Sequence, residues 1–137
     1  MKICIVSDSH DRAEALASAV REAAAQGAAA VIHCGDLIGA HTLRSATSAG
    51  LPLHLIHGNN LGDPVALHRL SHESGGLIQY HGADARIELG GRRIFVVHYP
   101  EYGHAMACTG GRARGSRHVG AGRSGSNALR FAASIAA

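Results

Sequence analysis

The chain has 137 residues, of which 46% are hydrophobic and 17% charged, so it is long enough for one domain with a real core. No stretch approaches the ~20 apolar residues of a membrane span, and no signal-peptide cleavage site follows Met1, so we expect a soluble, cytoplasmic protein. Cys4, Cys34 and Cys108 are odd in number and widely spaced, which favours reduced thiols over a disulfide framework.

Charge is divided unevenly along the chain. Residues 1–109 hold eight Lys and Arg against ten Asp and Glu, whereas residues 110–137 hold five Arg and no acidic residue. This tail is rich in Gly, Ala, Arg and Ser, so we predict a core over 1–109 and a flexible tail over 110–137, with no strand and at most a weak helix over 128–136. Because no aromatic side chains interleave with the arginines, a compositional by-product is favoured over a nucleic-acid site.

Apolar runs and helical patterns alternate in the first sixty residues. Residues 3–6, 28–33 and 53–57 read as buried strands. Between them we predict a helix that Asp11 caps and that runs to about Gln26, with Gly27 as its stop, and a short helix over 40–49. Three such units predict a parallel α/β layer.

The pattern changes after Leu61. A short helix is predicted over 65–70, and strands are predicted over 77–80, 83–89 and 92–98. Gly90 and Gly91 between two of these strands are a hairpin signal. Residues 98–104 read as a helix.

Polar residues stand where the predicted strands end. They are Asp8 and His10, Asp36, Asn59 and His98. In a parallel sheet such ends share one rim, so we expect these side chains to meet. Mixed oxygen and nitrogen donors suit Mn, Fe, Zn or Ni, and a carboxylate such as Asp36 can bridge two cations that clamp a phosphoryl group. For the first pair, a turn cap at Asp8 and a surface histidine at His10 remain the alternative.

Taken together, Asp8-x-His10, Gly35-Asp36, Gly58-Asn59 and a strand-terminal His98 resemble the calcineurin-like metallophosphoesterases, in particular the small bacterial and archaeal phosphodiesterase (YfcE-like) branch. The resemblance covers residues 1–108 and implies an α-β-β-α sandwich with two divalent metal ions between the sheets. It implies that Asp8 and His10 hold the first metal, that Asp36 bridges, and that Asn59 and His98 hold the second. The implied substrate is a phosphate ester, either a small molecule or a nucleotide.

Two departures from the family pattern bear on activity. Larger members of the family have a histidine that protonates the leaving oxygen where this chain has Asn60. The family's late Gly-His-x-His motif does not occur after His98. Small members of the family also lack that histidine, so Asn60 is compatible with turnover of phosphodiesters that have activated leaving groups. From the missing Gly-His-x-His motif we expect a fold that is incomplete at the C-terminus, weakened metal binding and impaired turnover, and we hypothesise a shifted reading frame or a diverged end after residue 109. Loss of the final strands would expose an apolar sheet edge, which favours either aggregation or a homo-oligomer. The alternative function is a non-catalytic binding or scaffold protein of the same fold.

Several histidines, one cysteine and one arginine lie outside these motifs. For His33 and His57, a packed or partly exposed histidine is favoured over a group that supports a metal ligand, and Cys34 is read as a buried apolar residue in preference to a nucleophile. Arg12 is equally suited to a phosphate or to water. Surface or loop positions are predicted for the other histidines, with a solvent position favoured over a substrate contact for the last: His41, His54, His68, His72, His81 and His104.

Overall fold

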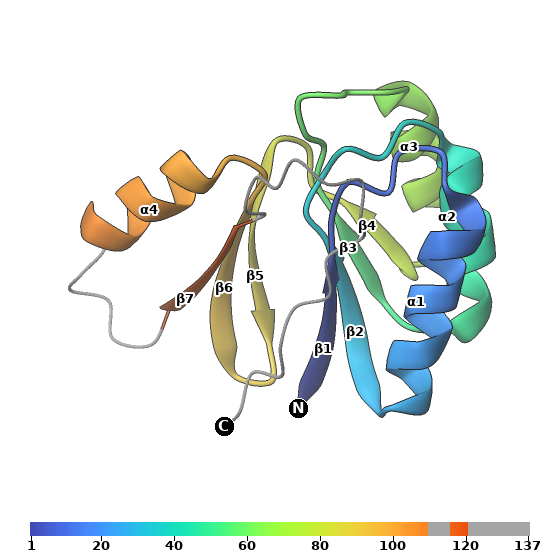
Figure 1. Cartoon of the computed structure of the whole chain (residues 1–137), viewed down its shortest axis with the longest axis horizontal. Coiled ribbons are helices and arrows are strands. Elements are labelled where there is room, and N and C mark those ends of the chain that lie inside the picture. The colour runs from blue at the N-terminus through green and yellow to red at the C-terminus, as the bar shows by residue number, and fades with distance from the viewer. Residues whose placement is uncertain (110–115, 121–137) are drawn as a thin grey trace.

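A computed structural model describes residues 1–109 and 116–120, which form four layers (Figure 1). Helices α1 (Ala13–Ala25), α2 (Ala40–Ala46) and α3 (Pro64–Glu73) cover one face of a four-stranded sheet. A three-stranded sheet faces the other side, and α4 (Pro100–Thr109) lies outside it. The predicted α-β-β-α sandwich is therefore confirmed. In the described ranges, no helix has the length and hydropathy that a membrane crossing requires.

The first sheet is parallel throughout. Its strands lie in the order β1 (Lys2–Val6), β2 (Ala28–His33), β3 (Leu53–Leu55) and β4 (Ile78–Tyr80). The predicted bounds of β2 are confirmed, whereas β3 ends two residues before the predicted His57. The 40–49 helix is confirmed as α2 followed by a 3-10 turn, Thr47–Ala49.

The start of α1 differs from the prediction. Its N-cap is Arg12, and no side chain caps it. Asp11 is exposed, and its Oδ1 lies 4.0 Å from His41 Nε2 instead. The turn that carries the preceding residues places the helix start one position later, so the expected cap at Asp11 is wrong. The predicted stop is confirmed, since α1 ends at Ala25 and Gly27 follows with φ +81°.

The second sheet is built on a hairpin. β5 (Asp84–Leu89) and β6 (Arg92–Val97) are antiparallel and pair Leu89 with Arg92. The turn glycines, Gly90 and Gly91, both have positive φ (+58° and +72°), as a tight two-residue hairpin turn requires.

The third strand of this sheet corrects the prediction for the tail. β7 (Ser116–Gly120) pairs in parallel with β6, although no strand was predicted in 110–137. Pairing uses main-chain groups only, so a segment without an apolar period can still extend a sheet whose edge is free. The weak helix predicted over 128–136 lies outside the described residues.

Two apolar clusters form the core. One packs between the helices and the first sheet and includes Leu53 and Leu55, and the other lies between the two sheets and includes Ile32. Since His54 pairs in register with Ile32 and alternates with its two leucine neighbours, it points toward the second sheet and is only 7% exposed. The surface position predicted for His54 is therefore wrong.

Candidate metal centre

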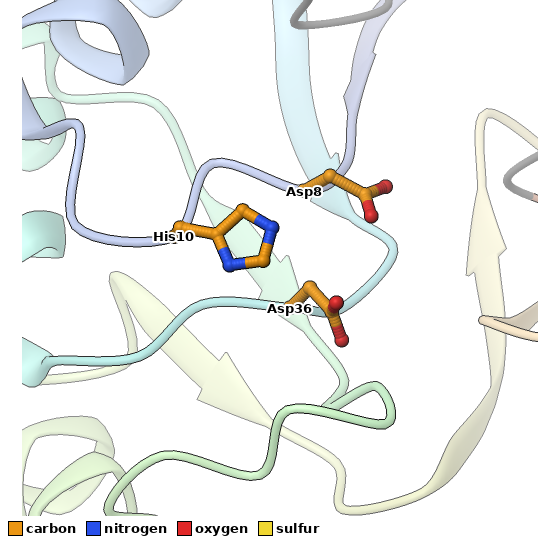
Figure 2. Close-up of side chains that lie close together, drawn as sticks. All are labelled: Asp8, His10 and Asp36. Carbon is orange, nitrogen blue, oxygen red and sulfur yellow. The ribbon is translucent and has the colours of Figure 1, made fainter. Parts of the chain in front are cut away.

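The loops that follow β1 and β2 bring three ligand-type side chains together (Figure 2). One ligand atom each of Asp8, His10 and Asp36 lies within 4.8 Å of the others. Asp36 is buried, and the other two are partly exposed. Two carboxylates and an imidazole at this spacing can share one divalent cation, because oxygen and nitrogen donors of this kind are its usual ligands. The predicted convergence of these three residues is present.

All three ligand-type residues have left-handed backbone. Their φ angles are +57° for Asp8, +48° for His10 and +57° for Asp36, and in the described residues no other non-glycine residue has positive φ. Left-handed backbone costs an L-residue roughly 1 kcal/mol or more, although Asp and Asn tolerate it best. Such strain persists only where the surroundings impose it, and it concentrates at functional sites.

A second group of donor atoms adjoins the first through Asp36. His98 Nε2 lies 2.9 Å from Asn59 Oδ1 and 3.5 Å from Asp36 Oδ1. His98 donates its Nδ1–H to the Cys34 carbonyl at 2.8 Å, so the neutral ring has its lone pair on Nε2. A neutral ring faces the Asn59 and Asp36 oxygens with its Nε2 lone pair, an arrangement that a bound cation stabilises, whereas a protonated ring would donate its Nε2–H to the same oxygens.

The five predicted residues therefore do meet, but not along a single sheet rim. Asp8, His10, Asp36 and Asn59 follow strands of the first sheet, while His98 follows β6 of the second. The expectation that all strand ends belong to one parallel sheet is wrong in this respect. The facing sheets instead supply donors from opposite sides.

Two glycines allow the loops to approach closely. A Cβ on Gly35 would lie 2.8 Å from both Gly58 N and His98 Nδ1, and a Cβ on Gly58 would collide with Asp36 Oδ1. Gly35 also has φ +104°, which side chains rarely adopt. The donor groups can therefore gather only because both positions lack a side chain. This close cradle and the donor types both fit a divalent cation.

Asn60 contacts Asp36 twice. Its main-chain N–H donates to Oδ1 at 2.9 Å, and its side-chain amide donates to Oδ2 at 2.6 Å. Each carboxylate oxygen keeps a further lone pair for a cation. Asn60 thus orients the predicted bridging carboxylate, a role that sequence reasoning missed because it considered this position only as a missing acid.

His33 is fully buried at the end of β2. Its Nε2 lies 2.8 Å from Ser9 Oγ, and its Nδ1 accepts a hydrogen bond from Gly35 N at 3.2 Å. Burial lowers the pKa of His33 to about 3, with smaller opposing and reinforcing effects from the charges of nearby residues. Neither partner is one of the five predicted ligands, but each is adjacent to one.

The other candidates make contacts of a different kind. Tyr80 OH lies 2.7 Å from His57 Nδ1, and the Nη2 of Arg12 donates to the Asp8 carbonyl at 2.8 Å. Cys34 is 1% exposed, which confirms it as a buried residue, and this burial raises the pKa of its thiol to about 12. The remaining predicted surface histidines are exposed or, for the last, half-buried: His41, His68, His72, His104 and His81.

With this geometry in view, the similarity to known proteins is decisive. Residues 1–123 match the calcineurin-like phosphoesterase superfamily domain. The chain belongs to the calcineurin-like phosphoesterase superfamily. This phosphoesterase match extends past residue 109 and includes β7. No curated protein sequence matches the chain.

Solved structures show the same fold. An archaeal phosphodiesterase superposes with a TM-score of 0.72 at 23% identity, covering 81% of this chain and 67% of its own. The phosphoesterase YfcE from E. coli gives 0.55 at 19% identity, covering 72% of this chain and 58% of its own. TT1561 of Thermus thermophilus superposes with a TM-score of 0.52 at 19% sequence identity, and the match covers 70% of this chain and 47% of TT1561. The chain thus spans less than two thirds of the length of the last two.

Proposed function

We propose that this chain is a metal-dependent phosphoesterase that hydrolyses phosphodiesters at a dinuclear centre. The observation that supports the proposal best is the meeting of Asp8, His10 and Asp36 within 4.8 Å, on strained loops of a phosphoesterase-superfamily fold. Two divalent ions in such a site would draw electron density from the phosphoryl group and lower the pKa of a water molecule.

The chain's own residues would share the binding. Asp8 and His10 would hold one ion, Asn59 and His98 the other, and Asp36 would supply one oxygen to each. Asn60 keeps the Asp36 carboxylate turned toward both positions through its two hydrogen bonds. Because an amide does not donate a proton to a leaving oxygen near neutral pH, the substrates should be diesters whose leaving group needs no acid.

A non-catalytic scaffold is the second candidate. It is favoured by one observation, namely that no Gly-His-x-His follows His98, which leaves each proposed metal position without one of the family's ligands. Three protein ligands and water can still form a working catalytic site, so we favour the enzyme.

The test measures metal content and turnover on the same samples. Purified chain loaded with Mn²⁺ should hold about two ions per chain and hydrolyse bis(p-nitrophenyl) phosphate, and Asp36→Asn should lose both by about 100-fold or more. Asp84→Asn, which changes an exposed carboxylate at the start of β5, is the matched control and should behave as wild type. Stoichiometric Mn²⁺ binding without turnover would identify the scaffold, and absence of both would refute the metal centre.

A further inference from the structure

The two loops of the metal centre share a buried connection that the proposed chemistry does not use. His33 is the last residue of β2 and is 0% exposed. Its ring lies between Ser9 Oγ, 2.8 Å from Nε2, and the main-chain nitrogen of Gly35, 3.2 Å from Nδ1. Ser9 itself is 0% exposed, so the whole connection is removed from water.

The hydrogen bonds fix how the ring is protonated. A main-chain N–H can only donate, so Nδ1 of His33 must carry a lone pair toward Gly35. The neutral ring therefore has its proton on Nε2 and donates it to Ser9 Oγ. In a charged ring the Nδ1–H would point at the Gly35 N–H, and burial also opposes the charge.

The His33 ring joins the two loops at residues that adjoin the proposed metal ligands. Ser9 lies between Asp8 and His10, and Gly35 directly precedes Asp36. Main-chain bonds link the same loops, from Asp8 N to Gly35 O at 3.0 Å and from His10 N to Asp36 O at 2.8 Å. The loops are thus held at both their main chain and a buried side chain.

Left-handed backbone at three residues needs such support. Each strained residue costs roughly 1 kcal/mol or more, which the loops would release by relaxing if nothing held them. A relaxed loop would move its carboxylate or imidazole away from the shared position, because φ sets the direction of the side chain. An apolar residue of similar size at position 33 would fill the core but would not hold Ser9 or Gly35.

We propose that His33 is a positioning residue whose ring ties Ser9 to Gly35 and thereby preorganises the loops of Asp8, His10 and Asp36 for a divalent cation. The inference rests on the proposed metal centre but concerns the metal-free protein as well. It assigns to His33 a role beyond filling the core.

The experiment separates the ring's two hydrogen bonds. His33→Leu fills the space without either bond, His33→Asn keeps an acceptor near Nδ1, and His33→Gln keeps a donor near Nε2. His54→Leu replaces a buried histidine of β3 outside the site and is the matched control. Mn²⁺ affinity is measured by calorimetry on each metal-free protein, with thermal unfolding recorded in parallel.

We expect His33→Leu to bind Mn²⁺ about 10- to 100-fold more weakly, as for other residues that orient metal ligands. Asn and Gln should each restore part of this loss, and His54→Leu should bind as wild type. Wild-type affinity in a folded His33→Leu protein, or an equal loss in His54→Leu, would overturn the inference. If His33→Leu does not fold, wild-type affinity in both the Asn and Gln variants would overturn it.

A second readout does not need metal. Hydrogen exchange at the Asp8 and His10 amides of the metal-free protein should be at least ~10-fold faster in the most perturbed folded His33 variant than in His54→Leu. If wild type binds no Mn²⁺, the proposed function fails while this exchange measurement still decides the role of His33. Equal exchange in the two proteins would then refute that role.

Discussion

Acid should destabilise this protein through His33 in a measurable way. Burial lowers the pKa of His33 from 6.5 to about 3. Between these values the unfolded chain binds a proton that the folded chain does not, so stability falls as pH falls. The contribution of the neutral ring is complete above pH 6.5 and is lost progressively toward pH 3. The perturbation is therefore a change from pH 7 to pH 4.5.

The size of the effect follows from the pKa difference. At pH 4.5 the solution is two units below the unfolded pKa and still above the folded one, and each unit is worth about 1.4 kcal/mol. The His33 proton alone should therefore lower the free energy of unfolding by about 3 kcal/mol between pH 7 and pH 4.5.

Urea unfolding of wild type and His33→Gln at both pH values, with chelator present, isolates this contribution. Other groups titrate in both proteins, including His54, whose pKa is lowered by burial and by the charge of His81. Between pH 7 and pH 4.5 the free energy of unfolding should fall by about 3 kcal/mol more in wild type than in His33→Gln. His68→Gln, at an exposed position on α3, should lose as much as wild type. An equal loss in wild type and His33→Gln would refute the reasoning.

Three further outcomes are expected. Asp36→Ala, which removes both carboxylate oxygens, should lower Mn²⁺ binding about 100-fold or more by calorimetry, and an unchanged isotherm would contradict its bridging position. Gly58→Ala should place a Cβ against Asp36 Oδ1 and destabilise the fold by about 1–3 kcal/mol in urea unfolding while weakening Mn²⁺ binding, whereas Gly27→Ala, with open space around it, should leave Mn²⁺ binding intact. In a thiol-reagent titration of the native protein, exposed Cys108 should react at once and buried Cys34, whose pKa burial raises to about 12, only on unfolding. Rapid labelling of Cys34 would show that the core between the sheets opens readily.

Much of the fold could be predicted because local chemistry and topology agree. The apolar runs of β1 and β2 end in polar residues, and in a parallel sheet that pattern has one consequence, a shared site at the carboxyl edge. The turn at Gly90 and Gly91 was equally clear, since two adjacent glycines between alternating segments favour a tight hairpin.

What could not be predicted depends on long-range contacts. The left-handed conformation of Asp8 and Asp36 is imposed by bonds between two loops distant in sequence, and neither loop alone indicates it. His54 reads as a polar residue in a short segment, yet its strand is covered on both faces. β7 has almost no apolar residues, and its strand pairing with β6 is a main-chain effect that composition does not reveal.

The strained loops also create a trade-off, because a substitution that relieves their backbone strain would stabilise the fold but remove a proposed metal ligand. Replacing His10, at φ +48°, with glycine would remove a Cβ from left-handed backbone and gain roughly 1 kcal/mol, while deleting a proposed ligand. A laboratory selection for thermal resistance alone would therefore enrich inactive variants at these positions. Engineering this scaffold for robustness should leave the loops after β1 and β2 untouched and seek its gains on the helical side.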